Sequence, residues 1–295
     1  MLTSLDPVVV AQMALGAIAD IAFAVVLGTA LLGFGAQRRA MALRIATTIW
    51  LVIECVYIVS EASQMAGQPL WAAWPLVPVV LRTTHFGRMW LLGIGAGLVV
   101  FGIACSFERG QSSGGVRRWW IVLACAVIAF AHAGTTHAAD AGDFSLAECV
   151  HAVHLWTTAA WGGVVIAAAW PLRRTFRPWS SETLDHLHRV SLIATLTFAI
   201  AIATGAANAW RGLGGSLAPL STSLWGELLT AKLIVVCAAV LIGAINRLAH
   251  LSRRHSIDRP TLDVFMRLLS FEAVLMVAVF AAASILGHSM PAAVG

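Results

Sequence analysis

The sequence contains few charged residues. Only 11% of its 295 residues are Asp, Glu, Lys or Arg, against about 25% in a typical soluble protein, and 59% are hydrophobic. The mean hydropathy is +0.84. This composition excludes a soluble globular domain and predicts an integral membrane protein. Because each crossing needs about 20 apolar residues, the chain has room for about eight helices and no large soluble domain.

Several sequence motifs are also absent. The five cysteines are scattered through apolar segments without a CxxC pair, so neither a disulfide framework nor a zinc knuckle is indicated. The chain lacks HExxH, a nucleophile elbow and a glycine-rich phosphate loop that follows a strand. We therefore expect that the protein is not an enzyme. The net charge of +5 comes from arginines in short loops between apolar segments, so no nucleic-acid partner is expected.

The apolar segments predict an all-α, polytopic membrane helix bundle of about eight transmembrane helices, which forms a single transmembrane domain over residues 1–295. The N-terminus lacks the basic region of a cleavable signal, so we expect the first helix to be retained. The segment 69–75 is rich in Trp and Pro, which favours a position at the membrane interface. The predicted spans are residues 8–35, 43–66, 86–107, 118–133, 146–172, 188–210, 225–247 and 262–287.

The arginines predict the orientation. Most of them follow spans one, three, five and seven, whereas the other side of the membrane has only Arg82, Arg88 and Arg211. Basic residues are enriched in cytoplasmic loops. Both termini are therefore predicted to lie outside, which in a Gram-negative cell is the periplasmic face of the inner membrane.

Histidines are concentrated near the outer ends of the predicted spans. Neutral imidazole binds copper, zinc, iron and nickel well, so a transition-metal or haem-iron site is predicted. Glu148, His151 and His154 are three residues apart and share a helix face. The alternative is that each histidine only hydrogen-bonds to a neighbouring helix. The candidate metal ligands are His85, His132, His137, His151, His154, His288, Glu148 and Met290, whose thioether suits Cu(I).

Ionisable residues also lie inside the predicted spans. Such residues are costly in lipid and normally face the interior of the bundle, where they have partners. One interpretation is a polar path that leads inward from the histidines. The other is a structural tie between Lys232 and one carboxylate. The members of this candidate intramembrane polar path are Asp20, Glu54, Glu61, Lys232 and Glu272.

The two halves of the chain share short similarities. Residues 84–88 (Thr-His-Phe-Gly-Arg) resemble residues 223–227 (Ser-Leu-Trp-Gly-Glu), and each segment begins the third span of its half. A weak repeat of four plus four helices, over residues 1–140 and 141–295, is therefore a hypothesis. Parallel repeats of this kind occur in transporters.

An ordered set of short motifs resembles the CopD/PcoD family of bacterial copper resistance D proteins. Most of them lie after about residue 80, and their order along the chain is the expected one. They are Thr84-His85-Phe86-Gly87-Arg88-Met89-Trp90, His151-x-x-His154 with Trp161-Gly162-Gly163, Ala203-Thr204-Gly205-Ala206-Ala207-Asn208, Trp225-Gly226 with Ala231-Lys232, Asn246-Arg247, and Phe271-Glu272.

The resemblance implies an eight-helix inner-membrane protein that accepts copper, as Cu(I) or Cu(II), from a periplasmic carrier of the CopC type and moves it into or across the membrane. The alternative is a protein that binds haem b between two histidines and transfers electrons, with His85 or His132 facing His151 or His154. A third possibility is a membrane scaffold whose histidines bind only a partner.

Overall fold

The computed structural model describes residues 7–107, 114–136, 142, 144–176, 181–251 and 258–293. Within these residues, eight helices are long and apolar enough to cross a membrane, as the sequence predicts. They are α1 (Pro7–Leu32), α2 (Ala36–Ala66), α4 (His85–Cys105), α5 (Gly114–Ala133), α6 (Leu146–Ala169), α7 (Ser181–Gly212), α9 (Leu224–His250) and α10 (Arg259–Gly287).

In the part of the chain that the structure describes, five short helices lie between these spans. Three of them, η1 (Leu70–Ala72), η2 (Trp74–Leu76) and α3 (Val77–Thr83), occupy and extend the Trp- and Pro-rich segment that was predicted to be interfacial. The other two are η4 (Arg173–Phe176) and α8 (Pro219–Thr222). None of the short helices is long enough to be a ninth span.

The helix α2 begins seven residues before its predicted start at residue 43, and the added segment contains Arg38 and Arg39. Arg44 donates to the carbonyl oxygens of Ala104 at 3.0 Å and Cys105 at 3.1 Å, which lack helical partners at the end of α4. Arg39 lies over the ring of Phe107 at 5.1 Å. Arg39 lies in the added segment and has a partner there, whereas Arg44 falls inside the predicted span and joins α2 to the end of α4.

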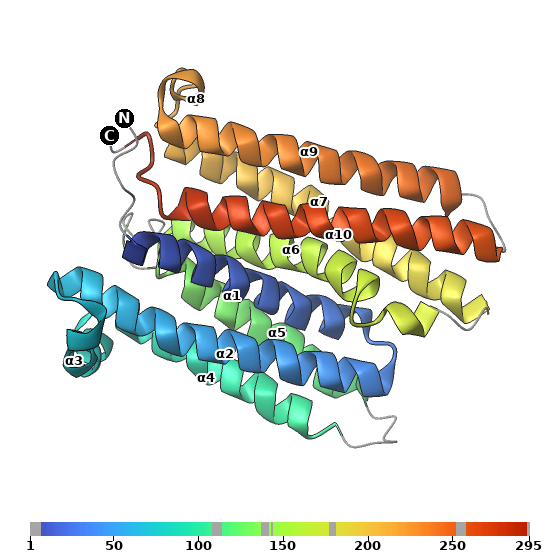
Figure 1. The fold of residues 1–295 in the computed structure, drawn as a ribbon, viewed down its shortest axis with the longest axis horizontal. Helices are drawn as coiled ribbons and strands as arrows, with labels where there is room; N and C mark the ends of the chain where they lie inside the picture. The colour runs from blue at the N-terminus through green and yellow to red at the C-terminus, as the bar shows by residue number, and fades with distance from the viewer. Residues whose placement is uncertain are drawn as a thin grey trace.

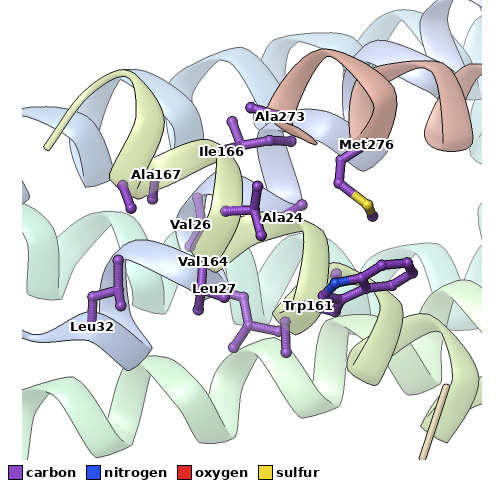
Figure 2. Close-up of a cluster of buried hydrophobic side chains, with 14 of the residues drawn as sticks. Ala24, Val26, Leu27, Leu32, Trp161, Val164, Ile166, Ala167, Ala273 and Met276 are labelled. Atoms are coloured by element: carbon purple, nitrogen blue, oxygen red, sulfur yellow. The ribbon is translucent and has the colours of Figure 1, made fainter. Parts of the chain in front are cut away.

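The helix α6 lies at the centre of the bundle. Its apolar window is 78% buried, against 17% for α9 at the periphery. Figure 1 shows α6 between α1 and α10, with α9 on one side of the bundle and α2 and α4 on the other. Its buried side chains, including Trp161, Val164 and Ile166, pack with Leu27 of α1 and Met276 of α10 in one apolar core (Figure 2).

The contact between α1 and α6 depends on two glycines. A Cβ atom on Gly28 would overlap the backbone of Gly163, and a Cβ atom on Gly163 would overlap the carbonyl oxygen of Ala24. Small residues allow helices in lipid to approach closely enough for their backbones to pack. These two positions therefore set the spacing of the central helix pair.

The helices α4 and α9 begin with the same local geometry. Thr84 and Ser223 are extended N-cap residues whose hydroxyl groups accept from the backbone N–H of Gly87 at 2.9 Å and Gly226 at 3.0 Å. Both hydroxyl groups also donate, at 2.7 Å, to the carbonyl oxygen four residues earlier, in α3 or α8. A Cβ atom on either glycine would overlap the backbone of that short helix. The repeat of four plus four helices remains a prediction.

The start of α1 and the end of α10 lie at one end of the bundle, together with α3 and α8 (Figure 1). We call this the terminal end. The last residues of α1, α4, α6 and α9 lie at the opposite end, where most of the described arginines are. The periplasmic position of the terminal end remains a prediction from the distribution of these arginines.

Candidate functional site

His151 and His154 both face α7. The Nδ1 atom of His154 is 3.0 Å from the carbonyl oxygen of Ala201 and 3.3 Å from Oγ1 of Thr204. The Nδ1 atom of His151 is 3.2 Å from Nδ2 of Asn208. The two imidazole rings are 6.4 Å apart between centroids and tilted by 31°. The helix pair α6 and α7 therefore fixes the position of both rings.

The hydrogen bond to Ala201 determines the tautomer of His154. A carbonyl oxygen only accepts, so Nδ1 of the ring carries the proton and Nε2 keeps its lone pair. Metal-binding histidines commonly donate their other ring N–H to a carbonyl in this way, which orients the ring. Nε2 of His154 is therefore available as a ligand atom.

Asp20 lies inside the bundle, and three basic residues lie within electrostatic range of its carboxylate. It lies thirteen residues after Pro7 in α1, about 20 Å along the helix at 1.5 Å per residue. Nε2 of His132, in the last turn of α5, is 4.0 Å from Oδ1 of Asp20. Lys232 of α9 and His288 also lie within electrostatic range of the carboxylate. Ionisable side chains from α5, from α9 and from the residue after α10 thus lie within electrostatic range of this carboxylate.

Lys232 forms no direct ion pair within the described part of the chain. It lies within electrostatic range of Asp20 and of both α6 histidines. His132 is likewise within range of His151, and Glu54 is within range of Asp20 and His132. We call Asp20, His132, His151, His154 and Lys232 the central cluster, with Glu54 at its edge.

A second polar group lies near the terminal end and joins α1, α2 and α10. Nε2 of Gln12, which is 1% exposed, donates to Oε1 of Glu61 at 2.9 Å. Nε2 of His288 lies 3.0 Å from the hydroxyl of Tyr57, and its Nδ1 lies 2.7 Å from the carbonyl oxygen of Ser284. Both ring nitrogens of His288 are thus already hydrogen-bonded. The ring links α10 to α2.

The other candidate ligands lie in different surroundings. Glu148 is completely buried at the start of α6, and its Oε2 accepts from the backbone N–H of Phe144 at 2.7 Å. His85 packs edge-on against the Phe144 ring, with 6.3 Å between centroids. Met290 is 69% exposed in the C-terminal tail. His137 lies outside the described residues.

The structure thus brings together part of the predicted set. His132 lies beside Asp20, and His151 lies near His154. Lys232 and Glu54 are within electrostatic range of members of this set, whereas Glu61 belongs to the second polar group and Glu272 lies elsewhere. Among the described residues, no three His, Cys, Asp or Glu side chains are close enough to hold a metal ion together.

Several residues that position this site were not predicted from the sequence. Asn208, Tyr57 and Gln12 were not predicted to be functional, although each hydrogen-bonds a candidate residue. The segment from Ala203 to Asn208 contributed to the family resemblance, but no role was assigned to Asn208. A polar residue four positions after Thr204, on the same helix face, was the available signal.

The comparisons with known proteins agree with the family resemblance. Residues 4–146 match the family described as copper resistance protein D-like, N-terminal domain, and residues 184–286 match copper resistance protein D. The inner membrane protein YebZ of Escherichia coli (strain K12) is 24% identical over 215 residues, which cover 71% of each chain. No solved structure matches the chain. Because the two matched segments follow one another and together cover most of the sequence, the chain belongs to the copper resistance protein D family.

Proposed function

We propose that this protein binds copper at the terminal end of the bundle and transports it across the bacterial inner membrane. The observation that supports this most is the central cluster. Asp20, His132 and Lys232 come from three different helices and lie within electrostatic range of one another or of the α6 histidines. A helix bundle that needed only to be stable in lipid would gain little from ionisable groups at this depth.

The chemistry of the cluster fits a copper ion as cargo. Imidazole nitrogen binds both Cu(I) and Cu(II), and His154 presents Nε2 with its lone pair free. Asp20 supplies the negative charge that a cation needs in a medium of low dielectric constant. Lys232 repels a cation near the histidines, so a protonated Lys232 and copper compete for the Asp20 carboxylate.

The surroundings of the cluster suggest how copper arrives. The terminal end is the proposed periplasmic face, and a soluble periplasmic carrier of the CopC type is the proposed copper donor. The carrier would deliver the ion to the outer histidines, from which it descends toward Asp20. In this proposal the protein moves an ion between compartments and catalyses no covalent step.

Removal of the two α6 histidines tests the proposal. We expect the double variant His151→Ala with His154→Ala to lose copper binding, because it removes both imidazoles that face α7. Copper stoichiometry and affinity are measured on purified protein in detergent by equilibrium dialysis. The control is the double variant His188→Ala with His250→Ala, which removes two histidines near the opposite end and should bind copper normally.

Three results would count against this assignment. Unchanged copper stoichiometry and affinity in the α6 double variant would exclude these histidines as the binding site. A Soret band with split α and β bands in the reduced protein would favour the haem b alternative, in which His132 and His151 are candidate axial ligands. Normal copper accumulation in cells that lack the gene would favour a scaffold.

Gly205 offers a more conservative test of His154. A Cβ atom at this position in α7 would be 2.9 Å from Cε1 of His154 and 3.3 Å from its Nδ1. We expect Gly205→Ala to displace the ring, weaken its bond to Ala201 and lower copper affinity roughly tenfold, or about 1.4 kcal/mol. Equilibrium dialysis measures the change.

The matched control for Gly205 is Gly102→Ala. A Cβ atom on Gly102 in α4 would meet no atom within 4 Å. This variant should therefore bind copper like the unmodified protein. Equal copper affinity in the two glycine variants would show that the position of the His154 ring does not control binding.

A further inference from the structure

A cavity of about 220 Å³ lies between α6, α7, α9 and α10, away from the central cluster. It extends from Arg247, three residues before the end of α9, to Glu272, thirteen residues after the start of α10. At 1.5 Å per residue, Glu272 is about 20 Å along α10 from the opposite end. The cavity therefore reaches from the arginine-rich end to the middle of the bundle.

Glu272 is a buried carboxylate without a direct partner. The residue is 6% exposed, and its side chain lies against Gly243 of α9, where a Cβ atom would be 2.7 Å from Oε1. Within the described residues its oxygens accept no hydrogen bond and form no ion pair. Arg247 is within electrostatic range, but its guanidinium donates to the carbonyl oxygen of Ser191 instead. Glu272 is thus not a simple structural tie.

Asn246 adds a second acceptor to the same cavity. The residue is 2% exposed, and its Nδ2 donates to the carbonyl oxygen of Phe265 at 3.1 Å. Its Oδ1 has no hydrogen-bond partner in the described part of the chain. Unpaired buried acceptors are costly. Two acceptor groups in one cavity therefore favour an occupant that brings positive charge or hydrogen-bond donors.

The lining of the cavity restricts the identity of this occupant. Hard metal cations take about six or more oxygen ligands, whereas Glu272 and Asn246 supply three side-chain oxygen atoms. Arg247 of α9 repels multivalent cations, and it is the only other ionisable residue among the lining residues of the four helices. Copper prefers nitrogen and sulfur ligands, which the lining side chains do not supply as free acceptors. A proton, shared with water, satisfies both acceptors without further ligands.

Apolar side chains lie between this cavity and the central cluster. Trp161 follows His154 by two helical turns on the same face of α6. Its ring is 4.9 Å from the ring of Phe198 on α7, and it is 5% exposed. Figure 2 shows Trp161 with Met276 of α10, which is completely buried and lies against Gly162. This layer separates the copper-binding half from the cavity.

We propose that Glu272 is a proton-binding site that exchanges with the opposite side of the membrane through this cavity, and that its proton is the ion coupled to copper movement. The coupling rests on the proposed copper transport, whereas the proton site does not. The apolar layer at Trp161 keeps the two ions in separate halves of the protein. Movement of either ion past this layer requires a rearrangement of α6, α7 and α10.

Carbodiimide labelling of the unmodified protein tests the proton site by itself. Dicyclohexylcarbodiimide is soluble in lipid and reacts with protonated carboxyl groups in apolar surroundings. We expect mass spectrometry to find the adduct on Glu272, in an amount that falls as the pH rises, and no adduct at this position in Glu272→Gln. The internal control is Glu182, whose side chain is 78% exposed and which should react with a water-soluble carbodiimide. An unmodified Glu272 at every pH would overturn the proton site.

A transport measurement in vesicles tests the coupling. We expect Glu272→Gln to bind copper at the terminal end with normal stoichiometry, but to lose the effect of an imposed pH gradient on copper movement. The control Glu182→Gln should respond to the gradient like the unmodified protein. An unchanged pH-gradient effect in Glu272→Gln would overturn the coupling. If the unmodified protein moves no copper, the proposed function fails, and the labelling result still decides the proton site.

Discussion

Replacement of Gly163 by alanine is expected to be among the most destabilising single substitutions in this protein. The added Cβ atom would overlap the carbonyl oxygen of Ala24 in α1, which is a backbone atom that no side-chain rotation can move away. The central helix α6 would have to separate from α1, which removes contacts along the buried core. We expect a cost of roughly 3 kcal/mol, at the upper end of the range for overpacked interiors.

The measurement is unfolding by denaturant in detergent, together with the yield of monodisperse protein on size-exclusion chromatography. Gly95→Ala is the matched control, because it makes the same change in a span where a Cβ atom meets nothing within 4 Å. Alanine has the higher helix propensity, so this control should be neutral or slightly stabilising. Equal stability of the two variants would contradict the close packing of α1 on α6.

The number of spans could be predicted from the sequence because it depends on length and hydropathy alone. The helix ends could not, because they depend on partners. Arg44 was placed at a membrane edge, but nothing in the sequence indicated that it would donate to the last carbonyls of α4, or that Arg39 in the added turns of α2 would lie over the Phe107 ring. The short helix α8 was missed for a similar reason, since its four residues pack through Gly226 of the following helix.

The residues of the candidate site could be named from the sequence, but their arrangement in space could not. The spacing of Glu148, His151 and His154 predicted one polar strip on α6. In the structure the histidines contact α7, whereas Glu148 lies near Gly134 after α5. The surroundings of each residue depend on how α6 is rotated against its neighbours, and close contacts such as Gly205 with the His154 ring set that rotation. A single sequence does not contain these tertiary contacts.

The partner of Asp20 illustrates the same limit. A tie between Lys232 and one carboxylate was one of two interpretations of the intramembrane charges. The structure places His132 nearest to Asp20, with Lys232 farther away but within electrostatic range. Asp20 is therefore not paired with Lys232 alone. A shared carboxylate serves an ion that passes through the cluster better than a closed pair does, because no single partner has to be displaced completely.

This arrangement predicts that substitution of Asp20 and substitution of Lys232 change the stability of the protein by different amounts. Among the residues that the structure describes, Asp20 is the only carboxylate within electrostatic range of Lys232, whereas Asp20 also has His132 and His288 within range. We expect Asp20→Asn to be the more destabilising change, because it leaves the Lys232 ammonium inside a membrane-spanning helix without a carboxylate in range. Lys232→Met should cost less. The double variant should recover most of the stability lost in Asp20→Asn.

Unfolding in detergent gives the coupling free energy of this double-mutant cycle, which we expect to exceed about 1 kcal/mol. The ranking of these variants by copper affinity should differ from their ranking by stability. Asp20→Asn and the double variant both lack the carboxylate, so both should bind copper at least roughly tenfold more weakly, which is about 1.4 kcal/mol. Lys232→Met, which removes the competing cation, should bind it as tightly as the unmodified protein or more tightly. Additive stabilities, or a double variant with normal copper affinity, would show that Asp20 is a structural residue and that the histidines bind copper without it.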